Sequence, residues 1–414
     1  MRGATIVCTL GPASEDTETI TELARAGMSV ARLNASHGTP EDRARVVEHV
    51  RAASAETGRP IPTILDVPGP EIRTAPLSDP VHIATDREYR LVEGATVEDG
   101  TVGVSRSLAA AEPGDRVLLD DGRIETTVQR VEGDDVVVHV DSGADLGGRK
   151  GVNVPGVDLG LEFVTESDRQ ELALAAEMGV AYVAASFVGD ADDVYAVKEH
   201  LESLGEDVPV IAKIERADAV ENIDGILTAA DGVMVARGDL GVECPLEQVP
   251  LIQKRIIHRA KRAGVPVITA TEMLDSMVHE RRPTRAEASD VANAVLDGTD
   301  AVMLSGETAV GDHPVRVVET MARIIRDVEA SEEYDESREH RVPPAGDTRT
   351  DAIARSARYL ARDVDATAVV TVTQSGYTAH KVAKYRPEVP IVAVTPDEQV
   401  QSRLALLWGT TPRH

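Results

Sequence analysis

The stretch Met28-Ser-Val-Ala-Arg-Leu-Asn-Ala-Ser-His-Gly-Thr39 opens with an apolar run typical of a buried strand and leads into a helical pattern at 40–57. Within it, Arg32, Asn34 and Ser36 occupy every second position. Alternate side chains of a strand lie on one face, so we expect these three polar groups side by side where the strand ends. The strand and the helix form one unit whose apolar faces need neighbours to pack against.

The same alternation of strand and helix recurs along the chain. Runs rich in Val, Ile and Ala predict strands, and amphipathic segments with start signals such as Thr165-Glu-Ser-Asp168 predict helices. Eight such units in a row favour the α/β class and a closed (βα)8 TIM barrel over an open sheet. Strands are expected at about 4–9, 28–33, 61–66, 180–186, 209–214, 231–236, 265–270 and 300–304, and helices at about 16–26, 40–57, 165–178, 190–204, 217–228, 246–263, 284–297 and 313–331.

One interval, residues 69–156, breaks this alternation. It carries Val- and Thr-rich runs with tight-turn signals, which predict a small β domain inserted after the third strand. Pro68-Gly-Pro70 and Pro155-Gly156 flank it as plausible hinges. The barrel would then consist of residues 1–68 and 157–332.

A polar segment at 331–347 predicts a linker to a further α/β domain at 345–414. This domain is expected to be incomplete, because the pattern supplies too few strands for a comfortable sheet. Its predicted helices are 349–362, 378–385 and 397–406, and its predicted strands are 367–373 and 390–395.

The composition restricts the class of protein. The chain has 414 residues, of which 42% are hydrophobic, and roughly two or three domains are expected. The formal charge of −28 argues against nucleic acid or an anionic membrane as a partner, and favours a salt-rich cytosol over an ordinary acidic enzyme. The sequence contains neither a signal-peptide pattern nor an apolar run of about 18 residues, which predicts a cytoplasmic location. Cys8 and Cys244 form no disulfide framework.

Polar residues gather where the predicted barrel strands end. In (βα)8 enzymes the catalytic groups come from the carboxyl ends of several strands, so this face is the expected active face. In chain order the strand ends carry Thr9; Arg32, Asn34 and Ser36; Asp66; Ser186; Lys213 and Glu215; Arg237 and Asp239; Thr269 and Thr271; and Ser305 and Glu307.

The first constellation combines Arg32 with the oxygen donors Asn34, Ser36 and Asp66. Amide, hydroxyl and carboxylate oxygens suit a hard monovalent or divalent cation, and a guanidinium suits an anion. For any single residue of this set, a solvated strand end is the alternative interpretation.

The second constellation joins Glu215 and Asp239, which can share one Mg²⁺ or Mn²⁺ and leave its other positions to water and substrate. Lys213 projects to the same side of its strand as Glu215. A buried salt bridge between Lys213 and Glu215 explains the same spacing, and the two interpretations stay open at this point.

Nine blocks of the sequence resemble, in order, those of the pyruvate kinase family, and the resemblance covers nearly the whole chain. It implies the (βα)8 TIM barrel, an inserted small β-barrel domain at 69–156 that acts as a lid, and the C-terminal α/β domain. The blocks are Thr5–Ser14, Gly27–Gly38, Gly69–Thr74, Lys150–Gly156, Ala212–Glu215, Val235–Gly241, Pro283–Glu287, Asp290–Gly298 and Met303–Thr308.

The resemblance implies transfer of a phosphoryl group from phosphoenolpyruvate to ADP, which gives pyruvate and ATP in the last step of glycolysis. It implies that Arg32 and Lys213 stabilise the transferring group. It also implies that Thr271 starts a proton relay to the enolate carbon, with Ser305 and Glu307. The implied substrate-binding residues are Arg32, Ser186, Lys213, Gly238, Asp239 and Thr271.

The resemblance also implies two ion sites: Mg²⁺ (or Mn²⁺) at Glu215 and Asp239, and K⁺ at Asn34, Ser36, Asp66 and the backbone of Val67. The nucleotide-binding residues that it implies are Thr9, Pro12, Asn34, His37, Arg73 and Lys150. Arg73 and Lys150 lie just inside the hinges, so closure of the lid would bring both cations onto the phosphates. Glu71 and Thr74 resemble the branch of the family that requires K⁺, although Asp66-Val-Pro-Gly-Pro70 lacks a lysine usual there.

The C-terminal part departs from the family. Thr373–Thr378 resembles a phosphate-binding turn that holds an effector in some members, but the last strands of the family do not follow. Effector control and the homo-tetramer of the family are therefore open. Two other functions remain as alternatives: a catalytically impaired truncated paralogue or assembly subunit, and a Mg²⁺-dependent phosphoenolpyruvate-type lyase barrel, which lacks a β lid.

Overall fold

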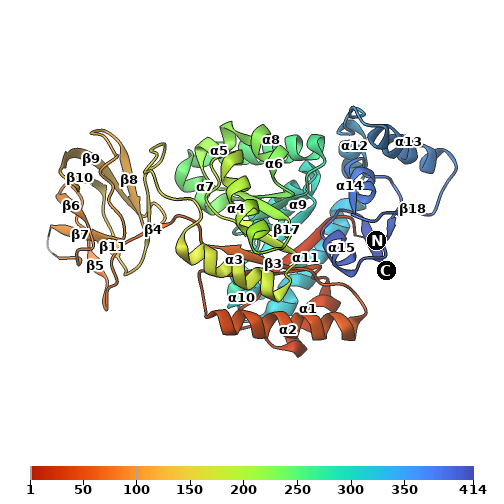
Figure 1. The fold of residues 1–414 in the computed structure, drawn as a ribbon, viewed down its shortest axis with the longest axis horizontal. Helices are drawn as coiled ribbons and strands as arrows, with labels where there is room; N and C mark the ends of the chain where they lie inside the picture. The colour runs from red at the N-terminus through yellow and green to blue at the C-terminus, as the bar shows by residue number, and fades with distance from the viewer. Residues whose placement is uncertain (1, 99) are drawn as a thin grey trace.

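The computed structural model describes residues 2–98 and 100–414. A small β unit lies at one end of the elongated molecule, a barrel surrounded by helices in the centre, and an α/β unit at the other end (Figure 1). This arrangement confirms the predicted architecture, while the domain limits 1–68, 69–156, 157–332 and 345–414 stay predictions.

The central unit is a closed barrel of parallel strands in the order β1-β17-β16-β15-β14-β13-β3-β2. Alternate side chains divide between two cores. Ile64, Ile211 and Met234 belong to the cluster inside the barrel, whereas Leu65 and Val235 pack toward the helices. The strands are β1 (Thr5–Thr9), β2 (Val30–Asn34), β3 (Thr63–Val67), β13 (Tyr182–Ala185), β14 (Val210–Ile214), β15 (Gly232–Ala236), β16 (Val267–Ala270) and β17 (Ala301–Leu304).

The barrel helices begin at side-chain caps. Thr39, Thr165, Asp190 and Thr284 each form a capping box that satisfies amide groups of the first turn. The helices are α1 (Thr17–Ala26), α2 (Pro40–Thr57), α3 (Glu166–Met178), α4 (Ala191–Ser203), α5 (Ala217–Glu221), α6 (Ile223–Ala229), α7 (Arg237–Glu243), α8 (Val249–Ala263), α9 (Arg285–Asp297), α10 (Gly306–Ala309) and α11 (Pro314–Glu329), with 3₁₀ turns at Leu246–Gln248 and Asp275–Val278.

Three details of the barrel helices differ from expectation. The helix predicted at 217–228 is interrupted at Asn222, and the helix predicted at 246–263 starts with a 3₁₀ turn. The short helix α7 follows β15 directly, and α10 follows β17 after Ser305 alone. Both short helices therefore lie at the carboxyl ends of strands, where the site is expected. In the described parts of the chain, no helix has the length and apolar character needed to cross a membrane.

The inserted unit is a seven-stranded sheet in the order β4-β12-β8-β9-β10-β6-β7 with its own apolar core, accompanied by the pair β11-β5. A bridge between Thr74 and Val104 links the two edges of the sheet, so the unit approaches a closed barrel. The strands are β4 (Ile72–Arg73), β5 (Val81–His82), β6 (Glu88–Glu93), β7 (Thr101–Val104), β8 (Arg116–Leu119), β9 (Ile124–Glu132), β10 (Asp135–Ser142), β11 (Asp145–Leu146) and β12 (Gly151–Asn153).

The C-terminal unit corrects two predictions. The expected linker contains the helix α12, and a third strand, β20, pairs in parallel with β19 through Thr410 and Ile391, so the expected shortage of strands was wrong in part. Its elements are α12 (Glu332–His340), α13 (Arg349–Asp363), β18 (Val369–Val372), α14 (Tyr377–Lys384), β19 (Ile391–Val394), α15 (Glu398–Leu404) and β20 (Thr410–Arg413).

Candidate active site

Asp66 lies at the centre of a buried charge cluster at the carboxyl ends of β2, β3 and β14. Its Oδ2 accepts a hydrogen bond of 2.7 Å from Arg32 Nε, and its Oδ1 lies 3.2 Å from Lys213 Nζ. Arg32 Nη1 also donates to Thr9 Oγ1 at 2.9 Å. Burial alone would raise the pKa of Asp66, but the charges of Arg32 and Lys213 outweigh it and hold the pKa below its usual value.

Lys213 joins this cluster to the neighbouring strand ends. Its Nζ lies 2.8 Å from Glu215 Oε1 and donates to Ser186 Oγ at 2.7 Å. The Ser186 hydroxyl in turn donates to the carbonyl oxygen of Val67 at 2.7 Å. Burial lowers the pKa of Lys213, whereas Asp66 and Glu215 raise it above its usual value, so the ammonium keeps its charge.

Glu215 and Asp239 form an acidic pair at the ends of neighbouring strands. Glu215 is 1% exposed, its Oε2 accepts a 2.7 Å hydrogen bond from the Phe187 amide, and its side chain interacts with that of Asp239 in α7. Burial raises the pKa of Glu215 to about 7, Lys213 opposes the rise, and Asp239 adds to it. Burial also raises the pKa of Asp239.

This donor set fits a divalent cation, because a bound cation relieves the repulsion between the buried Glu215 carboxylate and the half-buried Asp239 carboxylate. The salt bridge between Lys213 and Glu215 is present as well, so the two interpretations of that spacing are compatible. Among residues 2–98 and 100–414, no group of three or more acidic, histidine or cysteine side chains could hold a metal. The remaining coordination positions would therefore fall to water and substrate.

Gly238 and Thr271 lie against each other on the next two strand ends. A Cβ atom on Gly238 would lie 2.9 Å from Thr271 Cγ2, so only glycine permits this approach. Glu307, which is 1% exposed, accepts hydrogen bonds from the amides of Leu274 at 3.0 Å and Ser305 at 2.6 Å. Both carboxylate oxygens are thus engaged with backbone, and Glu307 ties the Thr271 loop to Ser305.

The predicted K⁺ donors gather only in part. Asn34 and Asp66 are direct register neighbours on β2 and β3, and Val67 follows Asp66. Ser36 is exposed on the turn after β2, where its amide donates to Asn34 Oδ1 at 3.1 Å. Asn34, Asp66 and Val67 thus come from neighbouring strand ends and Ser36 from the adjoining turn, and oxygen donors of this kind suit a hard monovalent cation.

The residues predicted to bind nucleotide occupy two places. Thr9 ends β1 and is buried, and Asn34 ends β2, whereas Pro12 after β1 and His37 after β2 are exposed. Arg73 and Lys150 meet at the hinge, because Arg73 on β4 pairs with Gly151 on β12. Arg73 Nη2 lies 2.7 Å from Glu71 Oε2, and Lys150 Nζ lies 2.9 Å from Asp120 Oδ1.

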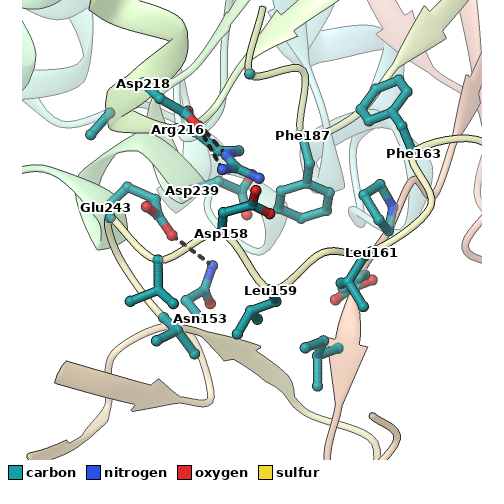
Figure 2. Close-up of a pocket in the computed structure, with 18 of the residues that line it drawn as sticks. Asn153, Asp158, Leu159, Leu161, Phe163, Phe187, Arg216, Asp218, Asp239 and Glu243 are labelled. Carbon is teal, nitrogen blue, oxygen red and sulfur yellow. Dashed lines mark hydrogen bonds and ion pairs between the residues drawn. The ribbon is translucent and has the colours of Figure 1, made fainter. Parts of the chain in front are cut away.

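A cavity of about 310 Å³ opens between the hinge strands and the barrel, beside Asp239 (Figure 2). Asn153 reaches across it and donates to Glu243 Oε1 at 3.4 Å, and Phe187 lines the same space. No sequence pattern pointed to Phe187, whose left-handed backbone (φ 59°) directs its amide at Glu215. Its place directly after Ser186 was the only available signal.

Comparisons with known proteins agree with this geometry. A family model described as pyruvate kinase, barrel domain, matches residues 1–318, and one described as pyruvate kinase, alpha/beta domain, matches residues 351–414. The chain is 47% identical over 422 residues to a pyruvate kinase of Geobacillus stearothermophilus, covering 99% of the chain and 71% of the relative. It is 46% identical over 413 residues to that of Mycobacterium tuberculosis H37Rv, covering 99% and 87% respectively. It is 41% identical over 418 residues to that of Clostridium acetobutylicum, covering 100% and 88%. On these matches, the chain belongs to the pyruvate kinase family.

Proposed function

We propose that this chain transfers the phosphoryl group of phosphoenolpyruvate to ADP and so forms pyruvate and ATP. The observation that carries the proposal is the position of Lys213, whose ammonium lies between Asp66 and the acidic pair of Glu215 and Asp239. A buried cation beside a divalent-ion site is the arrangement that transfer between two anions requires.

Arg32 and Lys213 attract the phosphoryl group and stabilise the charge that spreads over its oxygens during transfer. Both are anchored by Asp66, so their positions are set before substrate binds and little reorganisation is needed. Ser186 holds Lys213 from the other side through its hydroxyl.

Glu215 and Asp239 hold Mg²⁺ or Mn²⁺, which supplies Lewis-acid stabilisation of substrate oxygens when bound. The amide of Gly238, in the first turn of α7, donates to the substrate carboxylate. Asn34, Asp66 and Val67, with Ser36 from the turn, provide oxygen ligands for K⁺.

Thr271 supplies the proton that converts the enolate into pyruvate, from its place beside Gly238. Ser305 and Glu307 belong to the same relay. Glu307 also accepts hydrogen bonds from the amides of Leu274 and Ser305, so it holds the two loops together as well. Proton transfer requires each of these hydroxyl and carboxyl groups to lie within hydrogen-bonding distance of the group that receives its proton, directly or through one water.

Arg73 and Lys150 act on the nucleotide, together with Thr9, Pro12, Asn34 and His37. In the described geometry Glu71 and Asp120 hold the two hinge cations. Closure of the lid would exchange these acids for phosphate oxygens and expel water from the site.

The decisive assay couples pyruvate formation to lactate dehydrogenase, with phosphoenolpyruvate, ADP, Mg²⁺ and K⁺. We expect pyruvate and ATP in equal amounts, and loss of the reaction when ADP or the divalent ion is left out. Replacement of K⁺ by Na⁺ should reduce the rate strongly. Pyruvate formed without ADP would indicate that water accepts the phosphoryl group, which would contradict the proposal. No pyruvate under any of these conditions would favour one of the alternatives, an inactive paralogue or a lyase barrel.

A further inference from the structure

The loop after β16 adopts a backbone that its sequence does not favour. Thr271 and Glu272 are both left-handed, with φ of 72° and 52°. A β-branched residue such as threonine rarely occupies this region, and such a conformation persists only where its surroundings impose it. The loop also carries the hydroxyl assigned to proton transfer, so the groups that impose the conformation are of functional interest.

The side chain of Arg237 contacts this loop at three points. Its Nε donates to the carbonyl oxygen of Ala270 at 3.0 Å, and its Nη2 donates to the carbonyl oxygen of Thr271 at 2.6 Å. Nη2 also lies 2.8 Å from the Sδ atom of Met273. The guanidinium therefore fixes two successive carbonyl groups on either side of the Thr271 Cα atom.

The opposite edge of the same guanidinium is anchored by two barrel helices. Nη1 lies 2.6 Å from Asp290 Oδ2 in α9 and donates to Gln253 Oε1 in α8 at 3.4 Å. The Arg237 side chain is only 14% exposed. A planar group with several directed donors can serve all of these acceptors at once, which a lysine ammonium cannot.

Arg237 also begins α7, the helix that carries Gly238 and Asp239. The Thr271 methyl group faces Gly238, since a Cβ atom there would lie 2.9 Å from Thr271 Cγ2 and 3.9 Å from Oγ1. With its carbonyl held by Arg237 and its methyl group held by Gly238, Thr271 has little freedom to turn its hydroxyl.

We propose that Arg237 is a positioning residue for proton transfer by Thr271. It holds the loop after β16 in its left-handed conformation and keeps the hydroxyl directed at the enolate carbon. This inference rests on the proposed function, and it separates protonation from phosphoryl transfer, which depends on Lys213 and Arg32.

The test compares two reactions of the full-length chain. Exchange of the pyruvate methyl hydrogens with D₂O, followed by proton NMR with Mg²⁺ and K⁺ present, requires the proton donor. ATP formation from phosphoenolpyruvate and ADP reports phosphoryl transfer. Arg237→Lys should slow exchange by about a hundredfold, the effect of a misplacement of about 1 Å, and slow ATP formation less.

A matched control is Arg259→Lys on α8, which also breaks an arginine ion pair, at 2.8 Å to Asp224, but far from the loop. It should change neither reaction. Asp290→Asn weakens the ion pair that anchors Arg237 but keeps Arg237 itself, so a partial loss of exchange is expected. If Arg237→Lys unfolds at too low a temperature to assay, Asp290→Asn takes its place in the comparison.

A double-mutant cycle distinguishes positioning from general destabilisation. Once Thr271→Val has removed the hydroxyl, adding Arg237→Lys should not slow exchange further. A further loss in that background, or normal exchange in a folded Arg237→Lys variant of an active enzyme, would overturn the inference alone. A wild-type chain that forms no ATP would overturn the proposed function and this inference with it.

Discussion

Asp66 binds two cations at once in a chain whose formal charge is −28. At the residue scale, the site therefore holds two buried cations inside a strongly acidic molecule, each paired with a carboxylate. Lys213 keeps its charge although it is buried, because Asp66 and Glu215 lie close to its ammonium. Removal of one member of such a cluster leaves the others uncompensated, so substitutions here are expected to be severe.

Two lysine substitutions should have distinct effects. Lys213→Ala is expected to abolish phosphoryl transfer, since it removes the charge beside the transferring group and leaves Glu215 without its partner. Lys150→Ala should mainly raise the KM for ADP, because its ammonium lies on the hinge, 2.9 Å from Asp120. Steady-state kinetics with each substrate varied would check both results. An active Lys213→Ala enzyme would refute the assignment.

Much of the candidate site follows from a simple rule. The alternation along β2 and β14 predicts that Arg32 lies near Asn34 and that Lys213 lies near Glu215, and the barrel then brings these strand ends together. The contacts of Phe187 and Arg237 were beyond this rule. They depend on left-handed backbone and on loops from other strands, which a local pattern does not encode.

At the scale of elements, the turn from β3 into the inserted unit is packed against the site. Gly69 has φ of 74°, and a Cβ atom there would lie 2.8 Å from the carbonyl oxygen of Ser186. Ser186 holds Lys213, so the hinge and the catalytic cluster are in direct contact. A change in the hinge backbone at Gly69 can therefore displace Ser186 and, through it, the ammonium of Lys213.

Gly69→Ala should lower kcat, because the new methyl group must displace Ser186 and with it Lys213. Gly156→Ala is a matched control at the other hinge. Its φ is 78° and nothing lies within 4 Å of its Cβ position. Both variants should lose about 1 kcal/mol of stability from the left-handed backbone, measured by denaturant unfolding, but only Gly69→Ala should lose activity. Equal activity in the two variants would contradict the contact.

Two elements of the C-terminal unit show why prediction from sequence stopped short. α12 is nearly all polar, but Ser331 caps it and acidic residues fill its first turn, so these local signals outweigh the low apolar content. β20 contains Pro412, which argues against a strand unless the strand lies at an edge, as this one does. No local sequence signal identifies β19 as the strand with which β20 pairs.

The helix α14 should make stability depend on pH. Burial, with a smaller effect from Lys381, lowers the pKa of His380 to about 4, while Asp231 opposes the shift. The unfolded chain binds a proton near the ordinary histidine pKa of about 6.5, so this contribution to stability is lost as the pH falls from about 6.5 to about 4.

Melting temperatures measured across this range should fall less steeply for His380→Gln than for the wild type. His82→Gln is a suitable control, because that ring is 67% exposed on the inserted unit. Identical slopes for the wild type and His380→Gln would show that His380 does not couple folding to protonation.

The whole molecule carries 71 acidic and 43 basic residues, and its folded state must tolerate their repulsion. Added salt shortens the Debye length from about 10 Å at 0.1 M to about 3 Å at 1 M and should therefore stabilise the fold. We expect the melting temperature to rise similarly with KCl and NaCl.

Catalysis should respond differently, with KCl supporting turnover and NaCl failing to replace it. This contrast separates general screening from a specific K⁺ site. A melting temperature that falls with both salts would refute the screening argument, and equal rates in both salts would refute the specific site.

The seam of the barrel has a consequence for biosynthesis. Thr5 on β1 pairs with Ala301 on β17, and the carboxylate of Glu329 at the end of α11 accepts hydrogen bonds from the amides of Gly3 and Ala4. The ribosome thus delivers the first strand long before the partner that seals it. Until β17 has emerged, β1 presents an open edge of the kind that pairs with other chains, so we expect the nascent chain to be prone to aggregation during that interval.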